Sequence, residues 1–148
     1  MDVVTVAYWD KSENGDLGRE LVSKVKRKRL DMATPLYLLQ HLEKWKYIIL
    51  KEKIEDFYIK NSVILLTNED VDSKIDKLAI DDGKILLELQ SLGVKEEDAF
   101  IVLITSIFHL DCLVTLNRRH LKSKENEINK VLKKNGISTI KIVGPEEV

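Results

Sequence analysis

The sequence predicts an α/β fold with a mostly parallel sheet, formed by a single domain that covers residues 1–148. Short runs rich in β-branched and aromatic residues alternate with longer segments in which apolar residues recur at helical spacing. A length of 148 residues fits one domain, and with only 6 glycines and 2 prolines no segment has the composition of a flexible linker. A hydrophobic fraction of 44% with 33% charged residues is typical of a globular chain.

Composition also excludes several classes of protein. The lone cysteine, Cys112, rules out an internal disulfide and a multi-cysteine zinc site. No apolar run reaches the ~18 residues that span a membrane, and the first residues lack a signal-peptide pattern, so we expect a cytoplasmic protein without membrane contact. A net charge of −1 provides no global attraction for nucleic acid, so such contact requires a local basic patch. Abundant Lys and Glu beside scarce Gln, Cys and Met are typical of thermophile proteins.

The chain begins with a predicted strand. Residues 3–9 are almost continuously apolar, as in a strand buried on both faces, and Asp10 ends the run. Turn-forming residues at 11–16 precede a helix with one apolar stripe and a cationic end at 24–29.

A second strand is predicted at 30–33. Thr34 and Pro35 then match the N-cap and first position of a helix, whose apolar spacing continues toward Tyr58, with or without a break. A further strand is predicted within residues 61–67.

The second half continues the alternation of helix and strand. Helices are predicted at 70–80 and 83–92, the latter ended by Gly93. The acidic residues 96–98 begin the most apolar helix, which runs to about Leu110. The remaining elements are a strand at 113–116, a helix at 122–134 that stops at Asn135 and Gly136, and a strand at 138–143.

Polar side chains stand where two of these strands end. Asp10 follows the first strand and Asn117 follows the strand at 113–116. In an open parallel sheet, ligands bind beyond the carboxyl ends of the strands, so we expect both groups at one crevice. Asp98 lies in the first turn of the helix that leads into the second of these strands, and its carboxylate can reach the same rim. Oxygen ligands of this kind suit Mg²⁺ or Mn²⁺.

Each of these residues also has a structural explanation. An aspartate after a strand is commonly a turn or cap residue, and Asp98 is a favourable acid for a helix N-terminus. Asparagine tolerates turn geometry, so a structural Asn117 is as well supported as a ligand. No glycine-rich phosphate loop and no nucleophile elbow is present. A receiver-like domain requires a pair of acids after the first strand, which Asp10 does not provide.

Four segments, in this order, resemble the PIN domain nucleases over essentially the whole chain. They are Tyr8-Trp9-Asp10-Lys11-Ser12, the segment from Asp98-Ala99 to Ser106, Leu113 to Leu121 with Asn117-Arg118-Arg119-His120, and the ending Lys141 to Glu147. The resemblance implies a single three-layer domain with a central, mostly parallel twisted sheet flanked by helices.

The same resemblance implies a metal-dependent endoribonuclease. Asp10 and Asp98 would hold Mg²⁺ or Mn²⁺, Asn117 would complete the catalytic set, and Ser12 would support it. Many small family members are toxins of toxin–antitoxin pairs and others process ribosomal RNA, so RNA and an antitoxin-like protein are the implied partners. Arg118, Arg119 and His120 stand next to the predicted site, where a phosphate of RNA would lie.

Two residues depart from the family pattern. Gln40 stands where a glutamate is usual on the second helix, and Asn117 stands where an acid is usual. The predicted site therefore carries a charge of about −2 where the full set supplies about −4, counting each ionised carboxylate as one charge. Glu43 and Asp16 are spare carboxylates that would compensate if they reached the crevice.

These observations leave two hypotheses. One is a PIN-like ribonuclease with attenuated activity. The other is a catalytically inactive module that binds RNA or a protein, including a second copy of the chain through the apolar surface around Trp45 and Tyr47.

Overall fold

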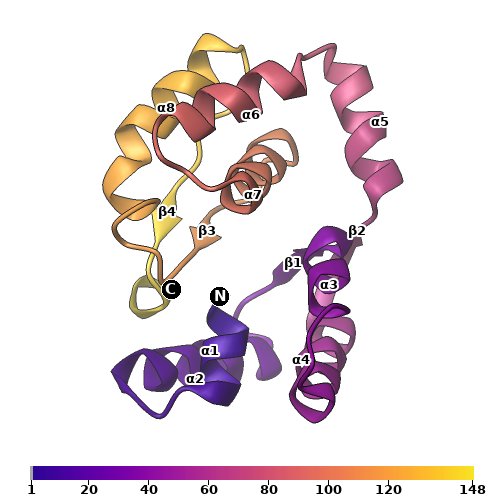
Figure 1. The fold of residues 1–148 in the computed structure, drawn as a ribbon, viewed down its shortest axis with the longest axis vertical. Coiled ribbons are helices and arrows are strands. Elements are labelled where there is room, and N and C mark those ends of the chain that lie inside the picture. The colour runs from indigo at the N-terminus through magenta and orange to yellow at the C-terminus, as the bar shows by residue number, and fades with distance from the viewer. Residues whose placement is uncertain (1) are drawn as a thin grey trace. The chain divides into compact units, whose positions relative to one another are not determined.

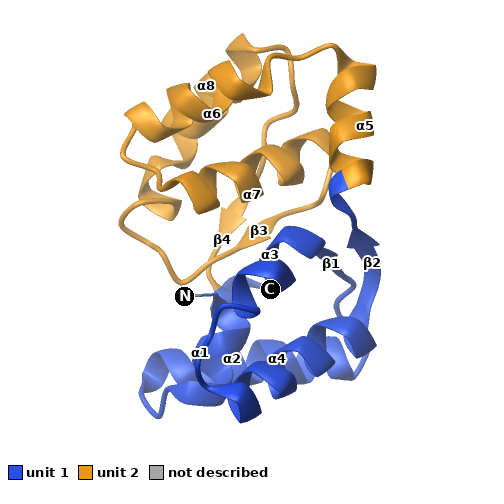
Figure 2. Cartoon of the chain, turned by 45° about the vertical axis from the view of Figure 1, so that its right-hand side comes forward, with its two compact units in different colours: residues 1–68, 145–148 blue, residues 69–144 orange. Residues whose placement is uncertain are grey.

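The computed structural model describes residues 2–148 and consists of two compact units. Unit 1 comprises residues 1–68 and 145–148, and unit 2 comprises residues 69–144 (Figure 2). Helices and short parallel strands alternate along the chain, an architecture compatible with the predicted α/β class. Within residues 2–148 each sheet has two strands, β1 with β2 and β3 with β4. None of the helices in this range has the length and apolar character needed to cross a bilayer.

The α-helices and strands of each unit are labelled in Figure 1. Unit 1 contains α1 (Val3–Trp9), α2 (Glu13–Lys26), β1 (Met32–Pro35), α3 (Leu36–Leu42), α4 (Ile48–Asn61), β2 (Ser62–Leu66) and the 3-10 helix η2 (Pro145–Glu147). Helix α5 (Asn68–Leu78) begins at the last residue of this part of unit 1. Unit 2 continues with α6 (Asp82–Ser91), α7 (Glu96–Ile107), β3 (Leu113–Val114), η1 (Lys122–Lys124), α8 (Glu125–Lys134) and β4 (Ile142–Val143).

The strand predicted at residues 3–9 is wrong, because these residues form helix α1. Asp2 caps the helix, and its Oδ1 accepts hydrogen bonds from the amides of Val4 at 3.0 Å and Thr5 at 3.1 Å. Residues 3–7 are all buried. A short run that is apolar at nearly every position has no period to separate a buried strand from a buried helix, so capping and packing decide.

Close packing of α1 against α2 depends on two glycines. A Cβ added at Gly18 would lie 2.9 Å from the carbonyl oxygen of Val3, and one at Gly15 would lie 1.9 Å from that of Asp10. The turn predicted at residues 11–16 is therefore mostly helix, since α2 begins at Glu13 and includes Gly15. A glycine read as a turn signal serves here to let two helices approach.

Strands β1 and β2 confirm the strands predicted around residues 30–33 and 61–67, displaced by one or two residues. They pair in parallel, with an irregularity of register next to Met32. Thr34 is not the predicted helix cap. It is buried within β1, and its Oγ1 lies 2.7 Å from Oγ of Ser62 on the neighbouring strand, so its hydroxyl has a partner across the sheet.

The helix predicted toward Tyr58 is interrupted between α3 and α4. The core of unit 1 forms where these helices meet α1 and α2. Its buried members are Val4, Ala7, Val22, Val25, Leu39, Leu42, Ile54, Phe57 and Tyr58. The Tyr58 hydroxyl donates to Oδ1 of Asp2 at 2.7 Å, which ties α4 to the cap of α1.

Unit 2 is built around α7, the most apolar helix of the sequence. Residues 102–107 are all buried, and α7 and α8 both pack against α6. The predicted helices at 70–80, 83–92 and 122–134 are confirmed as α5, α6 and α8 with small shifts of their ends. Gly93 and Gly136 adopt positive φ of 88° and 74° directly after α6 and α8, as glycine at a helix end allows.

Strands β3 and β4 are shorter than predicted. Leu113 pairs with Ile142 and Val114 with Val143, in parallel. From α8, the side chain of Asn129 bonds both the amide and the carbonyl of Ile140, at 2.8 and 2.9 Å. Part of the backbone that the sequence predicts as a strand therefore forms hydrogen bonds with a side chain of α8.

Candidate functional site

Asp98 and Asn117 are brought together in unit 2, as the sequence predicts. The Asn117 amide nitrogen Nδ2 donates to Oδ2 of Asp98 at 3.1 Å, although the residues are 19 positions apart. Asp98 lies in the first turn of α7, and Asn117 lies in the turn that follows β3. Both side chains are partly buried, which limits competition from water for this contact.

The orientation of the Asn117 amide follows from its two partners. Its Oδ1 accepts a hydrogen bond from the backbone amide of His120 at 3.1 Å, while its Nδ2 faces the carboxylate of Asp98. A flipped amide would place two N–H groups against each other and an oxygen against a carboxylate. Asn117 therefore donates a hydrogen bond to the Asp98 carboxylate, and its side-chain oxygen stabilises the turn that follows Asn117.

The residues after Asn117 form a compact basic turn. Thr115 Oγ1 accepts from the Asn117 amide at 2.9 Å, and the Asn117 carbonyl accepts from the Leu121 amide at 3.2 Å. Between these contacts lie Arg118 and Arg119, which are exposed, and His120, which is partly buried. Cationic side chains therefore belong to the turn that follows Asn117, whose side chain contacts Asp98, and guanidinium groups are suited to binding a phosphate.

Asp10 lies in unit 1, at the C-cap of α1. Its Oδ1 accepts from the Ser12 amide at 2.7 Å, and its backbone carbonyl accepts from Nη1 of Arg19 at 2.7 Å. The pKa of the Asp10 carboxyl is lowered, first by the Ser12 amide and then by the Ser12 hydroxyl; desolvation opposes this shift, and the Arg19 charge adds the least to it. Asp10 is thus held as a carboxylate next to the predicted supporting residue Ser12.

The other predicted site residues of unit 1 have local partners or lie on the surface. Gln40 is exposed on α3, and its Oε1 accepts from Nδ2 of Asn68 at 3.3 Å. Glu43 is exposed at the C-cap of α3. Asp16 is paired with Arg19 at 2.5 Å, so this spare carboxylate neutralises a cation of its own helix.

Comparison with known proteins gives no family. No protein-family model matches the sequence, and no match is found among curated proteins or among solved structures.

The carboxylates that could hold a divalent ion are those of Asp10 and Asp98. Asp98 offers a carboxylate oriented by Asn117, and Asp10 offers a carboxylate whose ionised form is favoured. Over residues 2–148 no group of three or more His, Cys, Asp or Glu side chains is arranged around a common point. Asp10 belongs to unit 1 and Asp98 to unit 2, so their joint binding of one ion stays a prediction.

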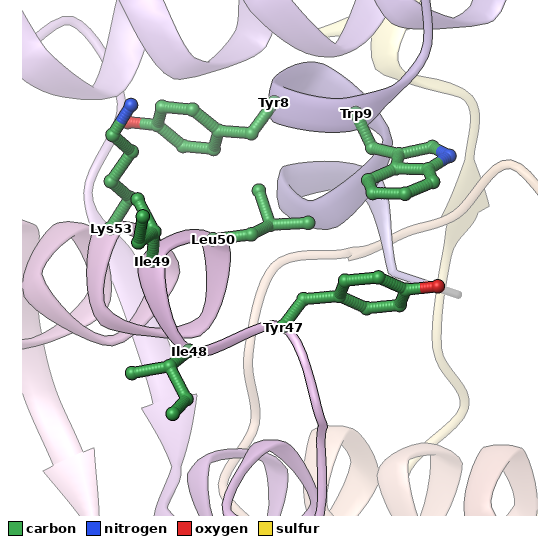
Figure 3. A pocket seen from close by; sticks show the side chains of 7 residues that line it. All are labelled: Tyr8, Trp9, Tyr47, Ile48, Ile49, Leu50 and Lys53. Carbon is green, nitrogen blue, oxygen red and sulfur yellow. The ribbon is translucent and has the colours of Figure 1, made fainter.

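Sequence reasoning overlooked an apolar hollow in unit 1. Tyr8 and Trp9, from α1, and Tyr47, which precedes α4, contribute to its wall (Figure 3). Trp45, which the sequence places on the surface together with Tyr47, is partly buried and packs against the core of unit 1. The available signal was the apolar run from Tyr47 to Leu50, which lacks the polar positions of an amphipathic helix.

Proposed function

We propose that the chain is a PIN-like endoribonuclease that depends on Mg²⁺ or Mn²⁺ and has attenuated activity. The observation that supports this most directly is the hydrogen bond between Asp98 and Asn117, with the basic turn 118–120 beside it. The sequence alone predicts that these residues belong to one site. A carboxylate with adjacent cations is the combination that phosphodiester chemistry requires, because the ion binds the acid while arginines bind the substrate phosphate.

Each residue has a distinct role in the proposed reaction. Asp10 and Asp98 would hold the ion, which supplies a water of lowered pKa and neutralises charge at the phosphodiester when bound. Asn117 positions the carboxylate of Asp98, and Ser12 positions that of Asp10. Arg118 and Arg119 would bind phosphates of a single RNA strand, which gives a local attraction that the net charge of −1 does not provide.

Attenuation follows from the two amides. Gln40 and Asn117 carry no charge, so two carboxylates would hold an ion for which the family pattern supplies four acids. Weaker neutralisation of the ion lowers its affinity for the site. We therefore propose cleavage that requires a high concentration of Mn²⁺ or Mg²⁺.

This function also retains the prediction of one central parallel sheet. A shared ion would place Asp10, which follows helix α1 rather than a strand, beside the carboxyl ends of the parallel strands, where ligands bind in doubly wound α/β folds. The pairings of β1 with β2 in unit 1 and of β3 with β4 in unit 2 are both parallel, which is the strand direction that this prediction requires.

The decisive experiment measures cleavage of an end-labelled single-stranded RNA by the purified full chain with Mn²⁺. We expect slow cleavage that EDTA stops, and a loss of at least about tenfold in rate for Asp98→Asn and for Asp10→Asn, as for other disrupted metal sites. Asp76→Asn, an exposed acid on α5, is the matched control and should cleave like the original chain. Absence of Mn²⁺-dependent cleavage, or cleavage unchanged by Asp10→Asn, would refute the enzyme proposal.

A second candidate is the inactive binding module, favoured by one observation. The oxygen of Asn117 accepts the His120 amide, so the residue at the position of a family acid serves the structure of the basic turn. Such a protein would bind RNA in EDTA without cutting it.

Restoring both acids distinguishes the two candidates. Gln40→Glu with Asn117→Asp places a carboxylate beside Asp98 in place of a hydrogen-bond donor, so the double variant should be less stable without metal and regain stability with Mn²⁺. If the scaffold is that of a nuclease, cleavage should rise above that of the original chain. If RNA binding is retained but cleavage stays absent, the binding module is the better description.

A further inference from the structure

The C-terminal end of helix α2 in unit 1 is strongly cationic. Four consecutive exposed cations lie there, and we define them as the basic helix end: Lys26, Arg27, Lys28 and Arg29. Over residues 2–148 none of the four forms an ion pair, whereas Lys24 in the preceding turn is paired with Glu20 at 3.3 Å. The basic helix end is therefore a group of neighbouring charges that no acid of unit 1 neutralises by direct contact.

The backbone of the basic helix end is held by a Schellman motif. The Lys28 amide donates to the Val25 carbonyl at 2.9 Å, and the Arg29 amide donates to the Lys24 carbonyl at 2.9 Å. Lys28 has a positive φ of 54°, in the left-handed region where glycine is the usual residue of this motif. The chain thus carries a lysine where glycine would be less strained, and it presents its cations on a hydrogen-bonded backbone.

The helix dipole accounts for only part of this charge. Cations in the last turn stabilise the negative end of a helix, and Lys24 and Lys26 already occupy that turn of α2. Arg27, Lys28 and Arg29 add three like charges directly after the helix, and these repel one another unless an anion lies between them. The cluster therefore favours an anionic partner.

The surroundings favour the phosphates of a nucleic acid over a lipid bilayer. Stable peripheral membrane binding requires an apolar or lipid anchor in addition to a few cations. Among residues 2–148, the large apolar side chains that are exposed all lie outside the segment 24–31. The guanidinium groups of Arg27 and Arg29, in contrast, are suited to phosphate, which they can bind through two parallel hydrogen bonds.

We propose that the basic helix end binds the phosphodiester backbone of RNA outside the predicted cleavage site. Helix α2 has 14 residues, so its two ends lie about 20 Å apart at 1.5 Å per residue. Asp10 and Ser12 precede its first residue, so they and the basic helix end contact different phosphates. The segment 24–31 exposes no aromatic ring that could stack on a base, so the binding is independent of RNA sequence.

This inference rests on the proposed action on RNA and adds a second contact region to it. It does not require catalysis, because the cations bind phosphate without the metal ion. The titration below is therefore carried out in EDTA. Absence of Mn²⁺-dependent cleavage would refute the nuclease and leave the outcome of this titration unchanged.

Fluorescence anisotropy of a labelled 20-nucleotide single-stranded RNA, titrated with the full chain in EDTA at several KCl concentrations, tests the inference. Arg27→Gln combined with Arg29→Gln removes two phosphate contacts. The slope of the logarithm of the binding constant against the logarithm of the salt concentration should then become shallower by about 1.4, at about 0.7 for each phosphate of a single strand. Between 50 and 200 mM salt, the ratio of the two affinities should change by about sevenfold.

The matched control is Lys130→Gln combined with Lys133→Gln. Both lysines are exposed on α8, and their replacement removes the same amount of charge from unit 2. This variant should bind RNA with the salt slope of the original chain. Circular dichroism of both double variants checks that the fold is retained, as the exposure of the four side chains leads us to expect.

Four results would overturn the inference. The first is an original chain that does not bind RNA in EDTA. The second is an unchanged affinity and salt slope after Arg27→Gln with Arg29→Gln. The third is an equal loss in the α8 control, which would show a general effect of net charge. The fourth is binding to vesicles of phosphatidylserine and phosphatidylcholine that the arginine variant weakens while RNA binding stays the same, which would assign the basic helix end to a membrane surface.

Discussion

Gly15 and Gly18 are required because helices α1 and α2 approach each other closely at these positions. Neither stands in a turn, and both lie on the side of α2 that faces α1. At Gly18 the nearest obstacles to a Cβ are a backbone oxygen and the Cβ of Ala7, at 2.9 and 3.0 Å. These atoms cannot move aside as the end of a flexible side chain would, so a methyl group has to displace a helix.

We therefore expect Gly18→Ala to lower the free energy of unfolding by about 1–3 kcal/mol, the usual cost of overpacking. Gly83→Ala is the matched control, since a Cβ there meets only an oxygen of Asp81 at 3.6 Å. In α6 that change should be neutral or stabilising by up to about 1 kcal/mol, because alanine restricts the unfolded chain. Urea denaturation of both variants measures the difference, and equal effects would show that α1 and α2 do not pack as described.

Asn117 shows how a single residue combines two functions. A carboxylate at this position could still accept the His120 amide, but it would face Asp98 as a like charge. The Asn117 amide stabilises the turn and donates a hydrogen bond to Asp98, but it contributes no negative charge that would bind a metal ion. The neutral residue therefore favours stability without metal.

Among the elements, α1 depends most on contacts outside itself. It has seven residues, fewer than an isolated helix needs, and five of them are buried. Asp2 anchors its start through Val4, Thr5 and the Tyr58 hydroxyl, and Arg19 donates to the carbonyls of Ala7 and Asp10 at its end. The Arg19 side chain of α2 thus bonds carbonyls at the end of α1, where the last carbonyls of a helix have no partner within it.

The contact between Tyr58 and Asp2 predicts how stability changes with pH. Burial raises the pKa of Tyr58 well above its usual value, and the charge and hydrogen bond of Asp2 raise it further. In the unfolded chain the hydroxyl ionises near pH 10, while in the folded chain it keeps its proton, so the unfolded state binds fewer protons above that pH. The free energy of unfolding should fall as pH rises above about 10, by up to about 1.4 kcal/mol per pH unit from this group.

Tyr58→Phe isolates that effect. The variant should lose about 1–2 kcal/mol at neutral pH, because Asp2 loses a donor, and its stability should depend less steeply on pH above about 10 than that of the original chain. Denaturation curves at several alkaline pH values compare the two proteins. Parallel pH dependences would show that Tyr58 ionises equally easily in both states.

At the scale of the whole molecule, the proposed function depends on residues from both units. Asp10 and Ser12 belong to unit 1, and Asp98 and Asn117 belong to unit 2. Each pair is organised locally, by hydrogen bonds of 2.7 and 3.1 Å. The nuclease proposal adds the prediction that both pairs meet at one ion.

Paramagnetic broadening by Mn²⁺ tests this prediction. If one ion binds both acids, the amide NMR signals of Ser12 and Asn117 should broaden together at the same Mn²⁺ concentration, and Mg²⁺ should compete for both. Asp98→Asn should then remove the broadening at both positions, because each ligand contributes to one site. If Asp98→Asn left the signal of Ser12 broadened as before, the acids would bind separate ions and the shared site would be wrong.

Local signals in the sequence predicted much of this structure. Gly93 and Gly136 end α6 and α8 because a positive φ is available to glycine, and β1 and β2 lie near the runs predicted as strands. Asp98 and Asn117 were selected as neighbours because a helix leading directly into a strand brings its first turn near the end of that strand. These features depend on interactions between residues that are close in the sequence, or on a single connection between two neighbouring elements.

The amino-acid sequence by itself therefore determined most of the alternation of helix and strand after residue 30, the ends of α6 and α8, and the proximity of Asp98 to Asn117. Only the tertiary structure decided that residues 3–9 form a helix, because a nearly continuous apolar run gains similar burial in either conformation and the glycines of α2 favour a packed helix. It also decided that the Asn129 side chain forms hydrogen bonds with the backbone of Ile140, and that Trp9, not Trp45, lies at the surface with Tyr47. Exposure and long-range hydrogen bonds depend on which elements meet in space, and no local pattern of residues encodes that.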